Sequence, residues 1–275
     1  MTASTSGASA PETAVPETPA PEIPAPDISV IVPAKDERDN LPELIEEIAA
    51  ALDGRGFEVI VVDDGSGDDT GEVLAELMRS RPFLRALRHA VSCGQSASVR
   101  SGLQVARGAV VVTIDGDGEN DPAYIPALIA ALEAAGDGVA LAAGQRTGRK
   151  ASWAKRQASR LANGLRGRLL KDQTRDSGCG LKAVRREVFL RLPYFDSWHR
   201  FLPALVLREG YGVTHVDIVD RHRRHGTSKY GILDRALVGV LDLYGVWWLR
   251  RRRKRVPQVS EITVRDRAMP EETGI

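Results

Sequence analysis

Carboxylate side chains gather at two places in this 275-residue chain. The first place holds Asp63 and Asp64, and the second holds Asp115, Asp117, Glu119 and Asp121 within seven residues. Carboxylates this close repel one another unless a cation or a set of hydrogen-bond donors balances them. Mg²⁺ and Mn²⁺ prefer oxygen ligands, and such ions commonly bind one or two carboxylates together with phosphate oxygens of a substrate. The second cluster therefore predicts a divalent metal site for a diphosphate, with Gly116 leaving room near the backbone.

Each cluster also has a plainer interpretation. Asp63 and Asp64 could accept hydrogen bonds from a base imide or a ribose hydroxyl, or could form a turn that caps the next helix. The second cluster could be a solvated acidic loop or a calcium loop. A calcium-binding hand needs a glycine at its sixth position and a glutamate at its twelfth, where Asn120 and Pro126 stand. The calcium interpretation therefore fails.

The clusters follow strands of a predicted α/β sheet. Apolar runs predict strands at residues 28–32, 57–62, 84–88, 109–114 and 139–143. Helical periodicity predicts helices at residues 40–54, 69–79, 95–106 and 122–135, the first with Asn40 as its cap. Almost continuously apolar strands indicate a mostly parallel sheet with helices on both faces, which binds ligands at the carboxyl ends of its strands. This pattern predicts a nucleotide-binding architecture. Dinucleotide binding is not expected, because no G-x-G-x-x-G follows the first strand.

Composition limits the classes of partner. The chain is 43% hydrophobic, which is enough for a core, and its net charge of +1 gives no reason to expect a nucleic-acid partner. Cys93 and Cys179 lack the spacing of a zinc site or a disulfide framework, which fits a reduced cytoplasmic setting. No run of 18 uncharged apolar residues occurs, so we expect no conventional membrane-spanning helix.

The ends of the chain differ in composition from its centre. Residues 1–26 are rich in proline and alanine and are predicted to be disordered, without the pattern of a secretory signal. The expected organisation is a globular domain at 27–232, a basic membrane-interface segment at 233–255 and a disordered end at 256–275.

Segments of the chain resemble a known family. IVPAKDERDNL, VVDDGSGDDT, GQSASVRSGLQVARG and VVTIDGDGENDP, in this order, resemble the family 2 glycosyltransferases of GT-A fold, whose Asp-x-Asp metal motif lies in the last segment. AGQR, ASRLANGLRGRLL, DSGCGLKAVRREV and RHGTSKYG resemble the dolichol-phosphate mannosyltransferase branch, which glycosylates polyprenyl phosphates. The match covers roughly residues 27 to 232. It implies a Rossmann-like, mostly parallel sheet and a nucleotide-diphosphate sugar as donor.

The resemblance also implies roles for single residues. Those expected to bind the nucleotide-sugar are Pro33, Lys35, Glu37, Asp63, Asp64, Asp115 and Gly116. Asp115, Asp117 and Glu119 are expected to hold Mg²⁺ or Mn²⁺, although relatives often have glutamine at the third position. Another departure is the segment Gly94, Gln95 and Ser96, where many members have a Gly-Lys-Gly type sequence. The catalytic residues implied are Asp117, Arg146, Arg224 and Lys229.

The acceptor is predicted from the absence of the family motifs that supply a catalytic base. Processive members of the family carry Glu-Asp and Gln-x-x-Arg-Trp segments for a saccharide hydroxyl, and neither occurs here. A lipid phosphate is already largely ionised near neutral pH and needs cations to position it. The predicted acceptor-phosphate ligands are Arg146, Arg160, Arg224, Ser228 and Lys229, with Arg166, Arg221 and Arg223 as further cations nearby. The alternative for any one of these arginines is a solvated basic face. Asp176 could orient an arginine, and Cys179 is expected to be a packed side chain.

The segment at residues 234–249 reads DRALVGVLDLYGVWWL and precedes six consecutive cations. It is too short to span a bilayer and contains Asp242. Aromatic rings beside cations are typical of a segment that lies at the surface of an anionic membrane. The alternatives are a core helix with a basic tail and an RNA-binding stripe.

Together these patterns predict an inverting transferase that moves a hexose to a polyprenyl or dolichyl phosphate for cell-envelope or lipid-linked glycan synthesis. Mannose from GDP-mannose is favoured, and glucose or another hexose from a UDP donor stays open. The expected location is peripheral, on the cytoplasmic face of the cell membrane. The alternatives are a transferase of the same fold with a saccharide acceptor and a non-catalytic nucleotide-sugar-binding adaptor.

Overall fold

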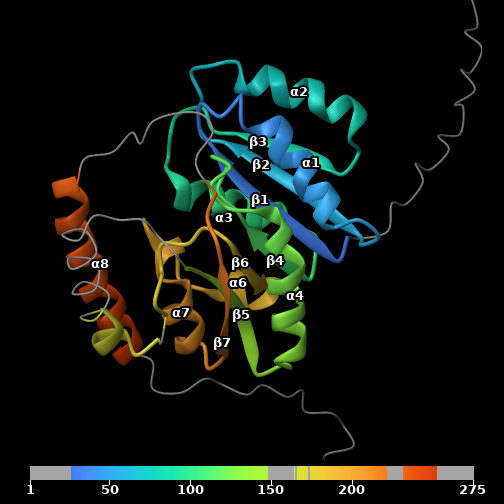
Figure 1. Cartoon of the computed structure of the whole chain (residues 1–275). Helices are drawn as coiled ribbons and strands as arrows, with labels where there is room; N and C mark the ends of the chain where they lie inside the picture. Colours follow the sequence, from blue (N-terminus) through green and yellow to red (C-terminus); the bar gives the residue numbers. More distant parts are fainter. Residues whose placement is uncertain (1–25, 148–163, 165, 173, 222–231, 253–275) are drawn as a thin grey trace, which may run out of the picture.

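A seven-stranded sheet forms the centre of the protein (Figure 1). The computed structural model describes residues 26–147, 164, 166–172, 174–221 and 232–252. The strands are β1 (Ile28–Ala34), β2 (Phe57–Asp63), β3 (Leu84–Arg88), β4 (Val110–Thr113), β5 (Val139–Arg146), β6 (Lys182–Arg185) and β7 (Gly212–Ile218). Their order across the sheet is β3-β2-β1-β4-β6-β5-β7.

All strand pairs are parallel except those of β6, which is antiparallel to both β4 and β5. The mostly parallel sheet predicted from the apolar runs is therefore confirmed. β6 and β7 lie outside that prediction for different reasons. β6 has only four residues, and β7 reads GVTHVDI, in which polar residues interrupt the apolar run.

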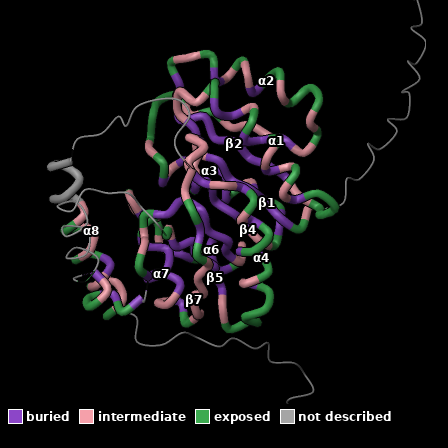
Figure 2. The backbone as a smooth tube through the Cα atoms, in the orientation of Figure 1, coloured by how far each residue is buried: buried purple, intermediate pink, exposed green. Residues whose placement is uncertain are grey.

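Helices cover both faces of the sheet. They are α1 (Leu41–Ala51), α2 (Thr70–Ser80), α3 (Gln95–Val105), α4 (Ile125–Ala134), α6 (Arg186–Arg191), α7 (Leu202–Arg208) and α8 (Ile232–Arg252), with short 3₁₀ turns η1 (Pro122–Tyr124) and η2 (Trp198–Arg200). Successive residues of β1 enter two separate apolar clusters, because strand side chains alternate between faces. One cluster contains α1, α2 and α4, and the other contains α3, α6 and α7. The central strands are accordingly buried on both sides (Figure 2).

Two local predictions differ from the structure. Asn40 does not cap α1: its backbone is helical, and its Nδ2 donates instead to Glu37 Oε2 at 2.6 Å. The helix predicted at 122–135 begins as the 3₁₀ turn η1 before α4. Pro126 has no N–H for an α-helical hydrogen bond to residue 122, so the first turn closes through the Ile125 amide to the Pro122 carbonyl.

α8 packs one face on the body of the protein and exposes the other. Val246 is buried, and Leu243, Trp247 and Leu249 pack against the cluster that contains α7. From residue 239 onward, the exposed apolar side chains of α8 are Val240, Leu241, Tyr244 and Trp248. Within the described residues, no helix combines the length and the apolar character that crossing a membrane requires.

Candidate active site

Asp115 follows β4 at the carboxyl edge of the sheet. Gln95, the first residue of α3, donates from Nε2 to Asp115 Oδ1 at 2.6 Å. Gly180 lies against the carboxylate on the other side, where an added Cβ would be only 2.4 Å from its atoms. Removal from water and repulsion from Asp117 raise the pKa of Asp115 to about 6. The carboxylate is thus held in place, and burial and Asp117 raise its pKa more than the nearby Lys182 and Arg146 lower it.

Asp117 and Glu119 lie on the turn that follows Asp115. The Glu119 amide donates to Asp117 Oδ1 at 3.1 Å, and the Arg221 amide donates to the Glu119 carbonyl at 2.8 Å. Among the described residues, Asp115, Asp117 and Glu119 do not bring three carboxylate oxygens within 4.8 Å of one another. This arrangement fits a divalent ion that binds one or two carboxylates and completes its coordination shell with diphosphate oxygens. It does not fit an ion coordinated by protein ligands alone.

The end of β1 lies directly beside the Asp115 turn. A Cβ on Gly116 would be 2.8 Å from the carbonyl oxygen of Pro33, so these two segments pack with no space for a side chain. Lys35 is half-buried on the loop that follows β1. The Glu37 amide donates to Thr70 Oγ1 at 3.1 Å, which ties the same loop to the start of α2. Pro33, Lys35 and Glu37 therefore lie at and just after the end of β1, beside the Asp115 turn, and their contact with a nucleotide stays a prediction.

Asp36 also fixes this loop, although no sequence pattern points to it. Its backbone is left-handed, with φ of 53°, its amide donates to Ser66 Oγ at 2.9 Å, and its Oδ1 accepts from the Gly67 amide at 2.8 Å. The loop after β1 and the loop after β2 are thereby joined.

Asp63 and Asp64 differ sharply in their surroundings. Asp63 Oδ1 accepts from the Ser66 amide at 2.8 Å, whereas the buried Oδ2 has no hydrogen-bond partner and lies 3.5 Å from Arg88 Nε. Both oxygens of Asp64 are fully used. They accept from His89 Nδ1, Ser92 Oγ and the amides of Cys93 and Gly94, at 2.7 to 2.8 Å.

A carboxylate offers about four acceptor positions, and Asp64 has filled them all. Burial opposes its ionisation, but these hydrogen bonds outweigh burial and hold the pKa of Asp64 at about 2. The ligand atoms of Asp64, His89 and Cys93 lie within 4.8 Å of one another, and this hydrogen bonding accounts for the grouping without a metal. We therefore expect Asp64 to shape residues 92–94, which lead into Gln95, whereas Asp63 keeps one buried oxygen that faces Arg88.

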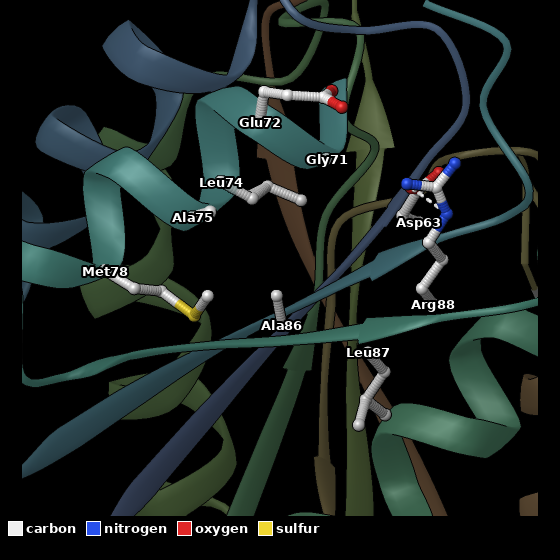
Figure 3. Close-up of a pocket in the computed structure, with 9 residues that line it drawn as sticks. All are labelled: Asp63, Gly71, Glu72, Leu74, Ala75, Met78, Ala86, Leu87 and Arg88. Carbon is white, nitrogen blue, oxygen red and sulfur yellow. Dashed lines mark ion pairs between the residues drawn. The ribbon is translucent and has the colours of Figure 1, made fainter. Parts of the chain in front are cut away.

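Asp63 and Arg88 also stand at one end of a pocket of about 320 Å³ between α2 and β3 (Figure 3). Apolar side chains such as Leu74, Met78 and Leu87 form the rest of its wall. Asp115 and Asp117 do not line it, so we do not place the reaction there.

Arg146 is engaged by carboxylates of the protein. It pairs with Asp176 through two nitrogens, one of them Nη2 at 2.8 Å from Oδ1, and its Nη1 lies 3.4 Å from Asp220 Oδ2. Asn120 Nδ2 donates to Asp220 Oδ1 at 3.2 Å and extends the network to the acidic turn. The suggestion that Asp176 orients an arginine fits this pair. A direct bond from Arg146 to a phosphate stays a prediction, and most of its donors are already used.

Two other predicted cations are engaged inside the protein. Arg166 is buried and pairs with Asp172, so it does not belong to a solvated basic face. Arg221 Nη1 reaches both oxygens of Glu47, at 2.7 and 2.8 Å, and its Nη2 lies 2.5 Å from Asp121. These arginines stabilise the segments around the site through their ion pairs, and neither guanidinium is left free to bind a phosphate through two nitrogens. Arg160, Arg223, Arg224, Ser228 and Lys229 lie outside the described residues, as do His222 and His225.

The structure adds two further residues that the sequence analysis missed. Lys182 is buried at the start of β6, donates to the Cys179 carbonyl and acts electrostatically on Asp115. Its signal was a lone charge inside the apolar run CGLKAV. Nδ1 of His199, in η2, lies in hydrogen-bond contact with Ser96 Oγ at 2.7 Å. Burial, and to a smaller extent the positive charge of Lys182, lower the pKa of His199 to about 3. Cys179 is buried, as predicted, and burial raises the pKa of its thiol.

A sequence model described as glycosyl transferase family 2 matches residues 29–192, which is more than half of the chain. The chain belongs to glycosyl transferase family 2. The matched segment contains the family 2 carboxylates at the ends of β2 and β4, together with Arg146 and Lys182. It ends before His199, Asp220 and α8.

Two curated relatives are named for polyprenyl phosphates. The chain is 34% identical to undecaprenyl-phosphate 4-deoxy-4-formamido-L-arabinose transferase of Edwardsiella ictaluri over 75% of this chain and 63% of that protein. It is 32% identical to dodecaprenyl-phosphate galacturonate synthase of Rhizobium johnstonii over 83% of this chain and 68% of that protein. The chain thus spans slightly less than two thirds of the length of the first of these relatives.

Solved structures support the GT-A fold of this family 2 chain. Glucosyl-3-phosphoglycerate synthase of Mycobacterium tuberculosis, solved with Mn²⁺, UDP-glucose and phosphoglyceric acid, superposes with a TM-score of 0.61. The match covers 82% of this chain and 79% of that one at 22% identity, so it carries the fold alone. The expectation of a GT-A fold, with a mixed sheet flanked by helices, is confirmed.

Proposed function

We propose that this chain transfers a sugar from a nucleoside-diphosphate sugar to a polyprenyl phosphate. The observation that carries the proposal is the placement of Asp115, which Gln95 and Gly180 hold at the edge of the sheet, ahead of Asp117 and Glu119. The curated relatives named for undecaprenyl and dodecaprenyl phosphate support the lipid acceptor.

The acidic turn would hold Mg²⁺ or Mn²⁺ through Asp117, with Asp115 and Glu119 beside it. When bound, the ion supplies positive charge to a leaving diphosphate. The chain itself orients the donor. Gln95 fixes the Asp115 carboxylate, Pro33 and Gly116 close one side of the site, and Asp63 would serve the nucleoside from the end of β2.

The acceptor side supports a substrate that needs no base. Asp176 and Asp220 both serve Arg146, so neither carboxylate is placed to remove a proton from a sugar hydroxyl. A phosphate acceptor is already ionised and can attack the anomeric carbon directly, with the nucleoside diphosphate leaving from the opposite side. This single displacement inverts the configuration. A saccharide acceptor is the second candidate and would require a base from another part of the chain.

The donor is proposed only as a nucleoside-diphosphate hexose or a related sugar. The resemblance favours mannose from GDP-mannose, whereas the curated relatives are named for a formamido-arabinose and a galacturonate. We therefore keep UDP-sugars on an equal footing with GDP-mannose.

The test is a transfer assay with purified protein, polyprenyl phosphate and a panel of GDP- and UDP-sugars. We expect one donor to give a lipid-phosphosugar, and we expect EDTA or Asp117→Asn to abolish the product. Asp121→Asn is the matched control, since Asp121 lies in the same acidic run but caps η1 and pairs with Arg221. Full turnover by Asp117→Asn would contradict the metal role, and transfer to a saccharide in place of the lipid would favour the second candidate.

The proposal includes a peripheral location on the cytoplasmic face of the membrane. It is supported by the exposed apolar side chains of α8, which lie at helical spacing from Val240 through Tyr244 to Trp248. Arg251 lies 4.6 Å from the ring centre of Trp247, and Arg252 lies 5.7 Å from that of Trp248, which places cations beside aromatic rings. This combination is typical of a helix at a membrane surface.

A further inference from the structure

A cationic pocket lies where the C-terminal end of α8 meets the segment 166–172. Its volume is about 320 Å³, and it is lined by Arg168, Leu169, Lys171, Trp247, Arg250 and Arg251. Four of these six side chains are cations and none is a carboxylate. In Figure 1 this end of α8 lies beside the yellow segment that contains residues 166–172. None of the carboxylates of the candidate active site contributes to the pocket.

The wall supplied by residues 166–172 is built on a fixed base. Lys171 has a left-handed backbone, with φ of 47°, and its amide donates to the Gly167 carbonyl at 2.8 Å. In the same segment the buried Arg166 pairs with Asp172, and nearby Thr174 Oγ1 lies 3.2 Å from His215 Nε2 of β7. The wall is therefore connected to the sheet.

The wall supplied by α8 is fixed as well. Arg208 of α7 donates from Nε to the Leu249 carbonyl at 3.4 Å, and Val246 is buried against the same side of the protein. Trp247 is packed between the apolar cluster and the Arg251 guanidinium. Both walls are thus set before any ligand binds.

Among the described residues, no carboxylate forms an ion pair with the cations of the pocket, which are Arg168, Lys171, Arg250 and Arg251. Asp172 acts electrostatically on Arg250, but its own partner is Arg166. A group of several unpaired cations beside a tryptophan matches a phosphate with an attached glycerol and acyl chains.

We propose that Arg168, Lys171, Arg250 and Arg251, together with Trp247, bind the phosphate headgroup of an anionic phospholipid at the membrane surface. The exposed Tyr244 and Trp248 extend from the pocket along α8 and reach the depth of the headgroups. This inference deepens the proposed function, because an enzyme whose acceptor is a lipid must first be held at the bilayer.

The test is co-sedimentation of the full chain with vesicles that contain neither donor nor polyprenyl phosphate. Vesicles of phosphatidylcholine alone are compared with vesicles of equal parts phosphatidylcholine and phosphatidylglycerol. We expect binding to the anionic vesicles only. Arg168→Gln and Arg251→Gln should each weaken that binding by about fivefold, which is about 1 kcal/mol per cation at a membrane surface.

Arg79→Gln is the matched control. Arg79 is an exposed arginine of α2, its removal changes the charge equally, and it does not line the pocket. We expect less than about a twofold loss for this variant, since only long-range attraction is removed. Equal losses for Arg168→Gln and Arg79→Gln would mean diffuse attraction and would overturn the site, as would an unchanged Arg168→Gln.

Competition distinguishes a lipid headgroup from free phosphate. A short-chain, water-soluble phosphatidylglycerol should release the protein from the vesicles at concentrations where inorganic phosphate does not. Release by both alike would mean a pocket for free phosphate and would overturn the lipid assignment.

Transfer in detergent micelles separates this inference from the proposed function. The pocket variants should keep wild-type turnover there, because no bilayer is needed to present the acceptor. Vesicle binding by a wild-type protein that transfers no sugar would leave the pocket standing and overturn the proposed function. Sugar transfer by a wild-type protein that does not bind the anionic vesicles would support the proposed function and overturn the lipid-binding pocket.

Discussion

Gly180 and Asp115 lie so close together that each limits the other. A Cβ at position 180 would be 2.4 Å from the Asp115 carboxylate, and Gln95 closes the opposite side. We predict that Gly180→Ala displaces Asp115 and lowers kcat by about 100-fold, as displacements of about 1 Å at reacting groups commonly do. Steady-state kinetics measure the loss, and circular dichroism shows whether the variant is folded.

Gly138→Ala is the control for this prediction, because an added Cβ at position 138 would meet nothing within 4 Å. It should keep wild-type turnover. If Gly180→Ala were also fully active, Asp115 would not need its present position, and the donor site proposed here would be wrong.

His199 gives a pH-dependent prediction at the same scale. Burial and the nearby Lys182 hold its pKa at about 3, below the usual 6.5, so the folded protein keeps this histidine neutral. The unfolded chain binds a proton below pH 6.5 and the folded chain does not, so stability is present above that pH and is lost as pH falls. Between about pH 7.5 and about pH 5.5 the loss should be about 1 kcal/mol.

Urea unfolding of wild type and His199→Asn at the two pH values measures this loss. Asparagine can keep a hydrogen bond to Ser96 Oγ, the partner of His199 Nδ1, but it does not titrate. The variant should therefore lack the part of the acid-induced loss that His199 contributes. An identical pH dependence for the two proteins would show that His199 is not held neutral.

At the scale of elements, the loop of residues 92–94 connects β3 to α3 and depends on Asp64. Two of its amides and one hydroxyl donate to that carboxylate. We predict that Asp64→Asn destabilises the fold by about 2 kcal/mol, since an amide group must face donors that the carboxylate accepted. Because the pKa of Asp64 falls from 3.8 to about 2 on folding, its contribution is present above pH 3.8 and is lost as pH falls toward 2.

Denaturant unfolding at neutral pH measures the stability change, and donor affinity measures its effect on the site. Gln95 follows the loop directly, so a loosened loop should also weaken nucleotide-sugar binding. Asp68→Asn is a suitable control, because Asp68 bonds the Thr70 amide and hydroxyl on another loop. Equal losses in both variants would argue against a special role for residues 92–94.

The elements that could be predicted are those with a strong local pattern. β1, β2, β4 and β5 lie in apolar runs of the sequence, the helices between the strands have clear helical periods, and the carboxylates at the ends of β2 and β4 follow from that order. β6 and the partners of Arg146 could not be predicted in the same way. Arg146 meets Asp176 and Asp220 only because β5 pairs with β6 and β7. Such pairs join residues far apart in the chain, and no local pattern encodes them.

At the scale of the whole molecule, the candidate site joins the two halves of the sheet. Asp63 and Asp115 come from β2 and β4, whereas Gly180, Asp176 and Asp220 come from segments beside β6 and β7. A ligand that contacts both groups adds its binding free energy to the stability of the entire fold. A nucleoside diphosphate with Mn²⁺ at about 100 times its dissociation constant should stabilise the protein by about 2.7 kcal/mol.

For a chain of this size, that stabilisation corresponds to a rise in Tm of about 5 to 10 °C. We predict this rise for either UDP or GDP, and the better of the two identifies the nucleotide. EDTA or Asp117→Asn should remove most of it, because the acidic turn then repels the diphosphate. The Asp121→Asn protein should keep the rise measured from its own baseline, since Asp121 serves η1 and Arg221. A rise that persists in EDTA and in Asp117→Asn would place the nucleotide in the fold without a metal and would contradict the role assigned to this turn.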